Sequence, residues 1–132
     1  MRPSCLPVKL GSAVILACWL IACNTASVYP TQTASWYSKA DCIKEGSSSV
    51  YTASGKRFDE NALTAASWFY PFGSKVKVTS LNNGKTINVT INDRGPAKRL
   101  VKKGRVLDLS RGAFEKLAPL SEGVIPIKLE AL

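Results

Sequence analysis

The amino-acid sequence predicts one small, mostly β domain, and its pattern of short strands favours a barrel. The length of 132 residues suits a single domain. Apolar residues make up 45% of the chain and charged residues 20%, which is typical of a globular protein and not of a disordered one. Short runs that alternate polar and apolar residues outnumber the one or two short segments that favour a helix.

The first half of the folded part leads to a predicted hairpin. Residues 35–37 favour a first strand, residues 39–51 are rich in serine, glycine and charge and predict a loop, and residues 61–66 favour a single helical turn. Residues 75–79 and 86–91 each alternate polar and apolar side chains, as half-buried strands do. Asn83-Gly84 between them is a strong hairpin turn signal, so we expect the two runs to pair.

The second half predicts two more strands with a short helix between them. Residues 105–109 favour a strand, and Ser110 follows at the position of a helix N-cap. A helix is expected over residues 111–117, because Pro119 prevents it from continuing. Residues 125–129 favour the last strand, in which Pro126 indicates an edge or a strand start.

The N-terminal residues predict export and a lipid anchor. Arg2 and Lys9 precede an apolar run over residues 10–22, which is shorter than the roughly 20 residues that span a bilayer. Residues 20–23 (Leu-Ile-Ala-Cys) resemble the bacterial lipobox, so residues 1–22 are predicted to be a lipoprotein signal peptide and Cys23 the lipidated N-terminus. The alternatives are an ordinary signal peptide that happens to contain Cys23, or acylation at Cys18. Residues 23–33 then form the lipidated cysteine and tether, and residues 34–132 the folded domain.

Charge and composition restrict the partners and the chemistry. The chain carries +9, and +7 once residues 1–22 are removed. An exported, membrane-anchored protein does not meet nucleic acid, so we expect anionic lipids and cell-wall polymers as partners, unless the charge only maintains solubility. In the bacterial lipoproteins that this N-terminus resembles, a residue other than aspartate after the cysteine, here Asn24, implies the outer membrane, facing the periplasm of a Gram-negative bacterium. We expect a monomer.

Histidine is absent, which excludes Ser-His-Asp and Cys-His catalysis. With Cys42 the lone cysteine after residue 23, a zinc site is disfavoured, and we expect no metal and no cofactor. Cys42 has no histidine to activate it and is expected to be buried and inert. An intermolecular disulfide through Cys42 is the alternative.

Several motifs occur in the order known from one family. They are ASWY at 34–37, TASGKRFD at 52–59, ALTAA at 62–66, PFG at 71–73, NGK at 83–85, INDRGP at 91–96 and LDLS at 107–110. Together they resemble the rare lipoprotein A (RlpA) family. The resemblance implies a small six-stranded double-psi β-barrel with one or two short helices. It also implies a lytic transglycosylase that cleaves peptidoglycan glycan strands lacking stem peptides at division septa. The same barrel resembles the wall-loosening domain of expansins.

Two positions depart from the family. An acidic residue usually follows Gly55, where this chain has Lys56, and a histidine usually follows ALTAA, where this chain has Ser67. Both positions are linked to activity in the family. A cation beside a carboxylate stabilises its ionised form and makes it a weaker acid, and serine cannot titrate near neutrality. A non-catalytic barrel that binds peptidoglycan is therefore the alternative function, and an expansin-like loosening protein is a weaker one.

Lytic cleavage needs one carboxylate that acts as acid and then as base, because the nucleophile is a hydroxyl of the substrate. Asp93 is the best candidate, since it ends an apolar strand and matches the family motif. Its alternative role is to bond turn amides or to pair with Arg94. Asp59 is the second candidate, with capping of the expected helical turn at 61–66 as its alternative role. Asp108 is expected to be structural, pairing with Arg94 or Arg111 or capping the following helix.

The expected substrate-binding residues surround these carboxylates. They are Ser67, Arg94, Trp68 and Lys56. Aromatic faces stack on sugar rings, so the run at 68–70 is able to line a glycan groove. We expect instead that two of its three side chains lie in the core and one covers a loop. The basic residues at 98–103 are expected in a loop that either holds wall carboxylates or faces solvent.

Overall fold

The computed structural model describes residues 31–44 and 50–132 of the chain. The predicted signal peptide, the lipidation of Cys23 and most of the tether lie outside the described residues. No helix among the described residues is long and apolar enough to cross a membrane.

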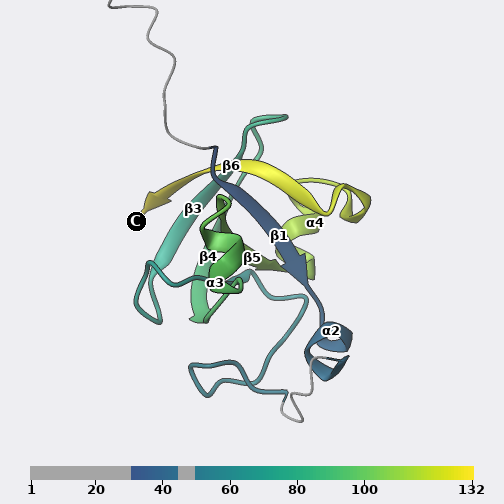
Figure 1. Cartoon of the computed structure of the whole chain (residues 1–132), viewed down its shortest axis with the longest axis vertical. Coiled ribbons are helices and arrows are strands. Elements are labelled where there is room, and N and C mark those ends of the chain that lie inside the picture. Colours follow the sequence, from purple (N-terminus) through teal and green to yellow (C-terminus); the bar gives the residue numbers. More distant parts are fainter. Residues whose placement is uncertain (1–30, 45–49) are drawn as a thin grey trace, which may run out of the picture.

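Within the described residues, six strands close into a barrel with short helices at its surface (Figure 1). The strands follow one another around the barrel in the order β1-β5-β2-β4-β3-β6. Their bounds are β1 Thr33–Tyr37, β2 Thr64–Ala66, β3 Lys75–Ser80, β4 Thr86–Asp93, β5 Arg105–Ser110 and β6 Val124–Ala131. The helices are α2 Lys39–Lys44, α3 Lys98–Val101, α4 Arg111–Glu115 and the 3-10 turn η1 Leu120–Glu122. The predicted mostly β barrel is therefore confirmed.

The strand pairing mixes parallel and antiparallel neighbours. β1 with β5 and β2 with β4 are parallel pairs, and β3 with β4 is the predicted antiparallel hairpin. Gly84 in its turn has φ +74°, a conformation that glycine adopts without a steric penalty. β6 pairs with both β1 and β3, so Pro126 lies near the start of a strand and not at an edge.

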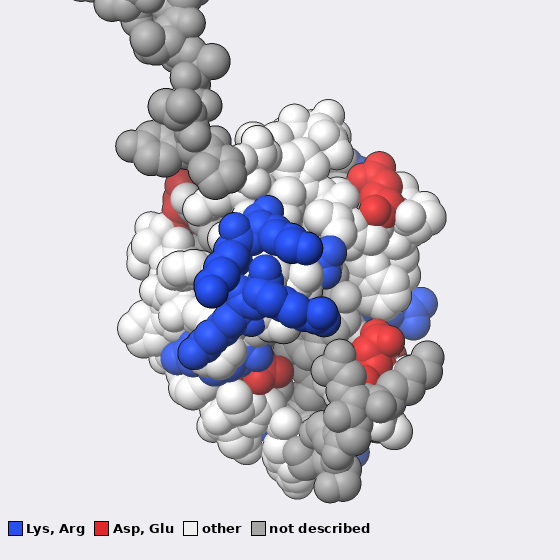
Figure 2. Space-filling model, in the orientation of Figure 1, with Lys and Arg blue, Asp and Glu red and all other residues white. Residues whose placement is uncertain are grey.

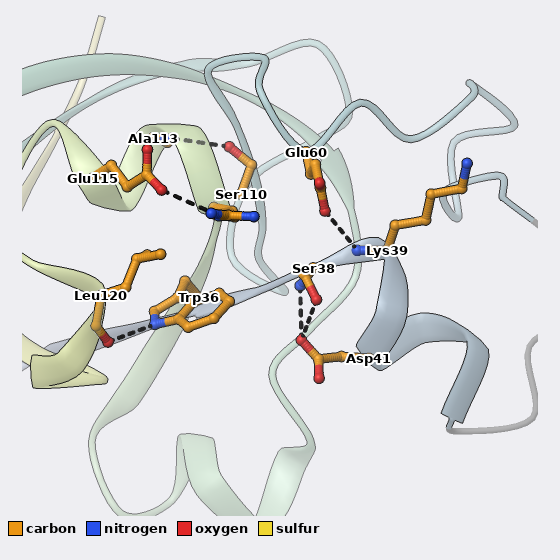
Figure 3. Close-up of polar contacts among 10 residues, drawn as sticks. Trp36, Ser38, Lys39, Asp41, Glu60, Ser110, Ala113, Glu115 and Leu120 are labelled. Atoms are coloured by element: carbon orange, nitrogen blue, oxygen red, sulfur yellow. Dashed lines mark hydrogen bonds and ion pairs between the residues drawn. The ribbon is translucent and has the colours of Figure 1, made fainter.

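The barrel is filled by branched side chains from the strands and by the helix that follows β5. Val76, Val78, Val89 and Ile91 of the hairpin are buried there. Phe114 of α4 is fully buried in the same cluster. The predicted N-cap is also confirmed, because the hydroxyl oxygen of Ser110 accepts a hydrogen bond from the Ala113 N–H at 3.2 Å (Figure 3).

Three local predictions were wrong. Residues 61–66 do not form a helical turn, because Thr64–Ala66 is β2, which pairs with β4 on one side and β5 on the other. Tertiary pairing here outweighs the helical preference of alanine. The expected loop at 39–51 begins with α2, and the basic loop at 98–103 contains α3.

Helix α2 is held by polar contacts at its start. Ser38 donates from its N–H (2.9 Å) and its hydroxyl (2.7 Å) to the carboxylate of Asp41, and the Lys39 N–H donates to Glu60 at 3.1 Å (Figure 3). These bonds satisfy amides that a helix N-terminus otherwise leaves unpaired. They fix α2 directly after β1, beside the pocket described next.

Candidate functional site

A pocket of about 420 Å³ opens at one end of the barrel, where β1, β4 and β5 meet α2 and α3. Three carboxylates line it, from Asp41, Asp93 and Asp108. Three guanidinium-bearing residues also line it, Arg94, Arg99 and Arg105. Cys42 lines it too and is half-buried, so it does not lie in the core as expected. The pocket therefore combines carboxylates able to exchange protons with cations able to bind an anionic ligand.

Asp93 accepts several hydrogen bonds in this pocket. It is the last residue of β4, as predicted, and three groups of the described residues donate hydrogen bonds to it. The Ala53 and Arg94 N–H groups each donate to Oδ1 at 2.9 Å, and the Tyr37 hydroxyl donates to Oδ2 at 3.1 Å. Both carboxylate oxygens are thus oriented before a ligand arrives, which is what a proton-transfer group needs.

Tyr37 supports Asp93 from the end of β1. Its ring stacks on Phe58 with centroids 4.7 Å apart. Burial, followed by the nearby negative charge of Asp93, raises the pKa of the Tyr37 hydroxyl well above its ordinary value. The hydroxyl therefore stays protonated and remains a donor to Asp93 in the neutral range.

The raised pKa of Tyr37 predicts a loss of stability in alkaline solution. Below about pH 10 the hydroxyl is protonated in both folded and unfolded chains, so its contribution is fully present. Above that pH the unfolded chain releases the proton while the folded chain keeps it, and the free energy of unfolding falls by up to about 1.4 kcal/mol per pH unit. Urea unfolding at about pH 8 and about pH 11 should show this slope in the wild type and a smaller slope in Tyr37→Phe. Equal slopes would contradict the assignment.

Asp108 was not expected in the site, but it lies at the same level of the barrel as Asp93. Ala66 of β2 is in register with Asp93 on one side and with Asp108 on the other. The Ser35 hydroxyl donates to Asp108, and a Cβ placed on Gly95 would lie 3.4 Å from Asp108 Oδ2. Ala66 and Gly95 line the pocket together with the two carboxylates.

Asp108 has a structural contact, because the Ser35 hydroxyl donates to it from the neighbouring strand. Of the groups expected beside Asp108, Arg111 pairs with Glu115 at 3.1 Å, Ser110 caps α4, and Nη1 of Arg94 donates to backbone carbonyls. The alternation along β5 indicates that Asp108 points away from the core, and the structure agrees, because Leu107 and Leu109 are fully buried whereas Asp108 is half-buried. Alternation alone does not say that β1 and β4 close a pocket around it.

Asp59 lies apart from this pocket. It is exposed and lines a separate surface hollow with Lys39, Arg57, Phe58 and Glu60. Its carboxylate accepts the Asn61 N–H at 2.9 Å, so it caps a turn, although not the helical turn that was expected. The structure thus does not bring the two predicted catalytic carboxylates into one site.

Lys56 lies in a tight loop that docks against Asp93. Its carbonyl accepts the Thr52 N–H at 2.8 Å, and Gly55 adopts φ +83° in the turn. Ala53 of the same loop donates to Asp93. The side chain of Lys56 is exposed and forms no ion pair with any carboxylate of the described residues. The loop backbone, and not the Lys56 ammonium, contacts the candidate catalytic group.

Ser67 is completely buried, so its hydroxyl does not face the pocket opening. Its N–H donates to the Asp93 carbonyl at 3.1 Å, and its Oγ accepts the Phe69 N–H at 3.1 Å. These bonds shape the turn that leads from β2 into the aromatic run. Ser67 therefore positions the segment between Asp93 and Trp68.

The aromatic run departs from its prediction. Only Tyr70 packs against the core, whereas Trp68 is 44% exposed and Phe69 59% exposed. Phe72 nearby is also exposed. Trp68 is fixed in place because its indole N–H donates to the Pro96 carbonyl at 2.7 Å. Two side chains of the run are thus exposed and one packs on the core, whereas two were expected in the core and one over a loop.

Arg94 fastens the aromatic segment to the end of β4. Its Nη1 donates to the carbonyls of Ser67 at 2.7 Å and Tyr70 at 2.9 Å. Its guanidinium lies 3.9 Å from the centre of the Phe72 ring. Arg94 lines the pocket, but its Nη1 contacts are structural ones.

These contacts predict a stability cost for Arg94→Lys of about 2 kcal/mol, because a lysine keeps the charge but lacks the planar group that lies over the Phe72 ring while its Nη1 donates to two carbonyls. Urea unfolding measures the cost directly. Arg99→Lys is the matched control, since Arg99 is exposed, and it should change stability by less than about 0.5 kcal/mol. An equal, small effect of both substitutions would contradict the role given to Arg94.

Comparison with known proteins gives a consistent result. A family model described as lytic transglycolase matches residues 29–129. The chain is 44% identical over 99 residues to a Nostoc protein named "Probable endolytic peptidoglycan transglycosylase RlpA", covering 75% of this chain and 24% of that protein. It is 40% identical over 109 residues to the Rickettsia felis "Endolytic peptidoglycan transglycosylase RlpA", covering 83% of this chain and 45% of that protein. The chain therefore spans less than half the length of these two relatives.

Solved structures share the barrel. The Streptomyces papain inhibitor is 29% identical, with a TM-score of 0.53, and the match covers 75% of this chain and 91% of that one. The apo form of Clavibacter michiganensis expansin matches with a TM-score of 0.56 at 22% identity, covering 78% of this chain and 50% of that one. Together with the family match, these likenesses confirm the double-psi type of the barrel.

Proposed function

Because the chain belongs to the lytic transglycolase family, and within it to the rare lipoprotein A (RlpA) proteins, we propose that it cleaves peptidoglycan glycan strands without water. The proposed substrate is a strand without stem peptides, and the proposed products end in 1,6-anhydro-muramic acid. The observation that carries the proposal is Asp93, held by three donors at the mouth of a pocket of suitable size.

In the proposed reaction, Asp93 exchanges protons with the substrate. A proton goes to the glycosidic oxygen as its bond to the anomeric carbon breaks. The 6-hydroxyl of the same muramic sugar attacks that carbon and gives up its own proton. One proton is delivered and one is taken up, so a single carboxylate is sufficient as acid and then base. No second carboxylate is needed to activate a water, in contrast to ordinary glycosidases.

Asp108 and the aromatic segment complete the proposed site. Asp108 faces the same pocket across Ala66, where it adds negative charge beside an anomeric carbon that becomes positive in the transition state. Trp68, held by Pro96, offers a fixed ring face on which a sugar stacks. In this proposal Ser67 and Arg94 hold Trp68 and Phe72 in place, and Lys56 lies at the edge of the loop that supports Asp93.

A non-catalytic peptidoglycan-binding barrel is the second candidate, and the residues at 56 and 67 support it. The chain has neither the acidic residue after Gly55 nor the histidine after Ala66. A buried Ser67 does not replace a titrating side chain. The two candidates differ in their products, because a binder retains intact strands.

The test is to incubate the full chain with purified glycan strands that carry or lack stem peptides, and to follow strand length over time. Shortening of the peptide-free strands is the expected result. Strands that are retained by the protein but keep their length would overturn catalysis and favour the binder. If Lys56→Glu with Ser67→His then creates activity, these two positions account for its absence in the parent.

We propose further that the protein is an outer-membrane lipoprotein anchored through Cys23 and facing the periplasm of a Gram-negative bacterium, where it acts as a monomer. The sequence of residues 20–24 supports this placement. Membrane fractionation of the wild type and of Cys23→Ala measures it. Release of Cys23→Ala from the outer-membrane fraction is expected, and unchanged retention would contradict the anchor.

A further inference from the structure

A patch of basic side chains borders the pocket on the side of α3. Figure 2 shows Lys and Arg side chains gathered in one group over this helix. The basic rim is formed by Lys98, Arg99, Lys102, Lys103 and Arg105. The first four are exposed and Arg105 is half-buried. The ion pairs of Glu130 with Lys77 and Lys128, and of Arg111 with Glu115, involve none of the five. The four exposed side chains of the rim present their charge to solvent, where a ligand can reach it.

Two members of the basic rim reach the pocket itself. Arg99 and Arg105 line it together with Asp93 and Asp108. On the neighbouring side, the Lys98 ammonium lies 4.9 Å from the centre of the Trp68 ring. A sugar stacked on Trp68 with its scissile bond at Asp93 would therefore have cations along one edge. Pro96, whose carbonyl holds the Trp68 indole, also lines the pocket, so the aromatic ring lies beside the pocket and the rim.

We propose that Arg99 and Arg105 bind the free lactyl carboxylate of N-acetylmuramic acid, an inference that rests on the proposed function. Every second sugar of a peptidoglycan strand carries this carboxyl group. Where a stem peptide is attached the group is a neutral amide, and where the peptide is absent it is an anion. A planar carboxylate fits the fork of a guanidinium, which makes paired, charge-assisted hydrogen bonds to it.

The position of the two arginines favours a group on the substrate over a separate anionic polymer or membrane. They line the pocket that contains the proposed reacting groups, whereas Lys102 and Lys103 of the rim do not. A membrane or a separate anionic polymer that contacted only the outer rim would not reach Arg99 and Arg105 inside the pocket. The two arginines then select peptide-free strands by charge, in addition to any exclusion of the peptide by its size.

The test uses one strand preparation in two forms. Peptide-free strands are compared with the same strands after their carboxylates have been converted to neutral methylamides. We expect the full-length wild type to bind the charged strands at least about tenfold more tightly than the amidated ones. The variant Arg99→Gln/Arg105→Gln should bind both forms with the weaker affinity. The matched control Lys102→Gln/Lys103→Gln removes the same charge outside the pocket and should keep the preference.

Three results would overturn the inference. The first is equal binding of both strand forms by the wild type. The second is an equal loss of strand binding in the arginine and the lysine double variants. The third is an arginine double variant that binds strands normally and loses only its binding to anionic phospholipid vesicles. Urea unfolding confirms that each variant is folded. Binding and cleavage are measured separately. If the protein prefers charged strands but does not cleave them, the inference stands and the proposed activity is lost. If it cleaves both forms equally, the proposed activity stands and the inference is lost.

Discussion

Replacing Asp93 with asparagine is expected to reduce strand cleavage by about 10²- to 10⁴-fold, the range that a positioned acid–base group contributes. Asparagine keeps the size of the side chain and an oxygen that can accept from the Ala53 and Arg94 N–H groups. The Tyr37 hydroxyl can rotate to accept from the new amide. The barrel should therefore remain folded while proton transfer is lost. The rate of appearance of anhydro-ended products measures the first effect, and urea unfolding the second.

The matched comparison is Asp59→Asn, which makes the same chemical change in an exposed carboxylate outside the pocket. Asp59 caps the turn at Asn61, so a modest loss of stability is expected, and the cleavage rate should change by less than about threefold. A large loss of activity in Asp59→Asn together with a small one in Asp93→Asn would place the chemistry in the other hollow.

Replacing Phe114 with alanine is expected to lower the free energy of unfolding by about 3 to 5 kcal/mol. Phe114 is fully buried, and α4 places it in the cluster that also contains residues of β3, β4 and β5. The substitution removes buried apolar surface and leaves a cavity that rigid strands do not fill. Because small domains have only about 5 to 15 kcal/mol in total, the variant should be close to unfolding at physiological temperature. Urea unfolding or the thermal midpoint measures it.

Phe114→Leu is the graded control, because it keeps part of the buried volume and should cost less than the alanine variant. The nearby buried residue Ala118 cannot serve as a control, because its side chain is already small and its removal would leave no comparable cavity. A loss below about 1 kcal/mol for Phe114→Ala would mean that α4 is not part of the main core.

Most of the fold was predictable where its signals are local. Asn83-Gly84 and the alternation on each side identify the hairpin of β3 and β4, and Ser110 identifies the start of α4. β2 was missed because its three residues form a strand only through pairing with β4 and β5, strands distant from it in the sequence. A run rich in alanine contains no local sign of that pairing.

The candidate site was predictable in part. Asp93 follows from its place at a strand end and from the family motif. Tyr37 and Asp108 were missed because the pocket exists only once β1, β4 and β5 are brought together. The exposure of Trp68 was missed for a related reason. Its indole is held by the carbonyl of Pro96, and the turn that makes this contact is not visible in the aromatic run itself.

Product analysis in water enriched in heavy oxygen tests whether the pocket at Asp93 breaks the glycan strand without water, as proposed. The full chain is incubated with peptide-free strands in this water, and the new strand ends are analysed by mass spectrometry. We expect 1,6-anhydro-muramic ends that contain no heavy oxygen and that are absent with Asp93→Asn. Reducing ends that carry heavy oxygen would show hydrolysis and contradict the claim, as would intact strands.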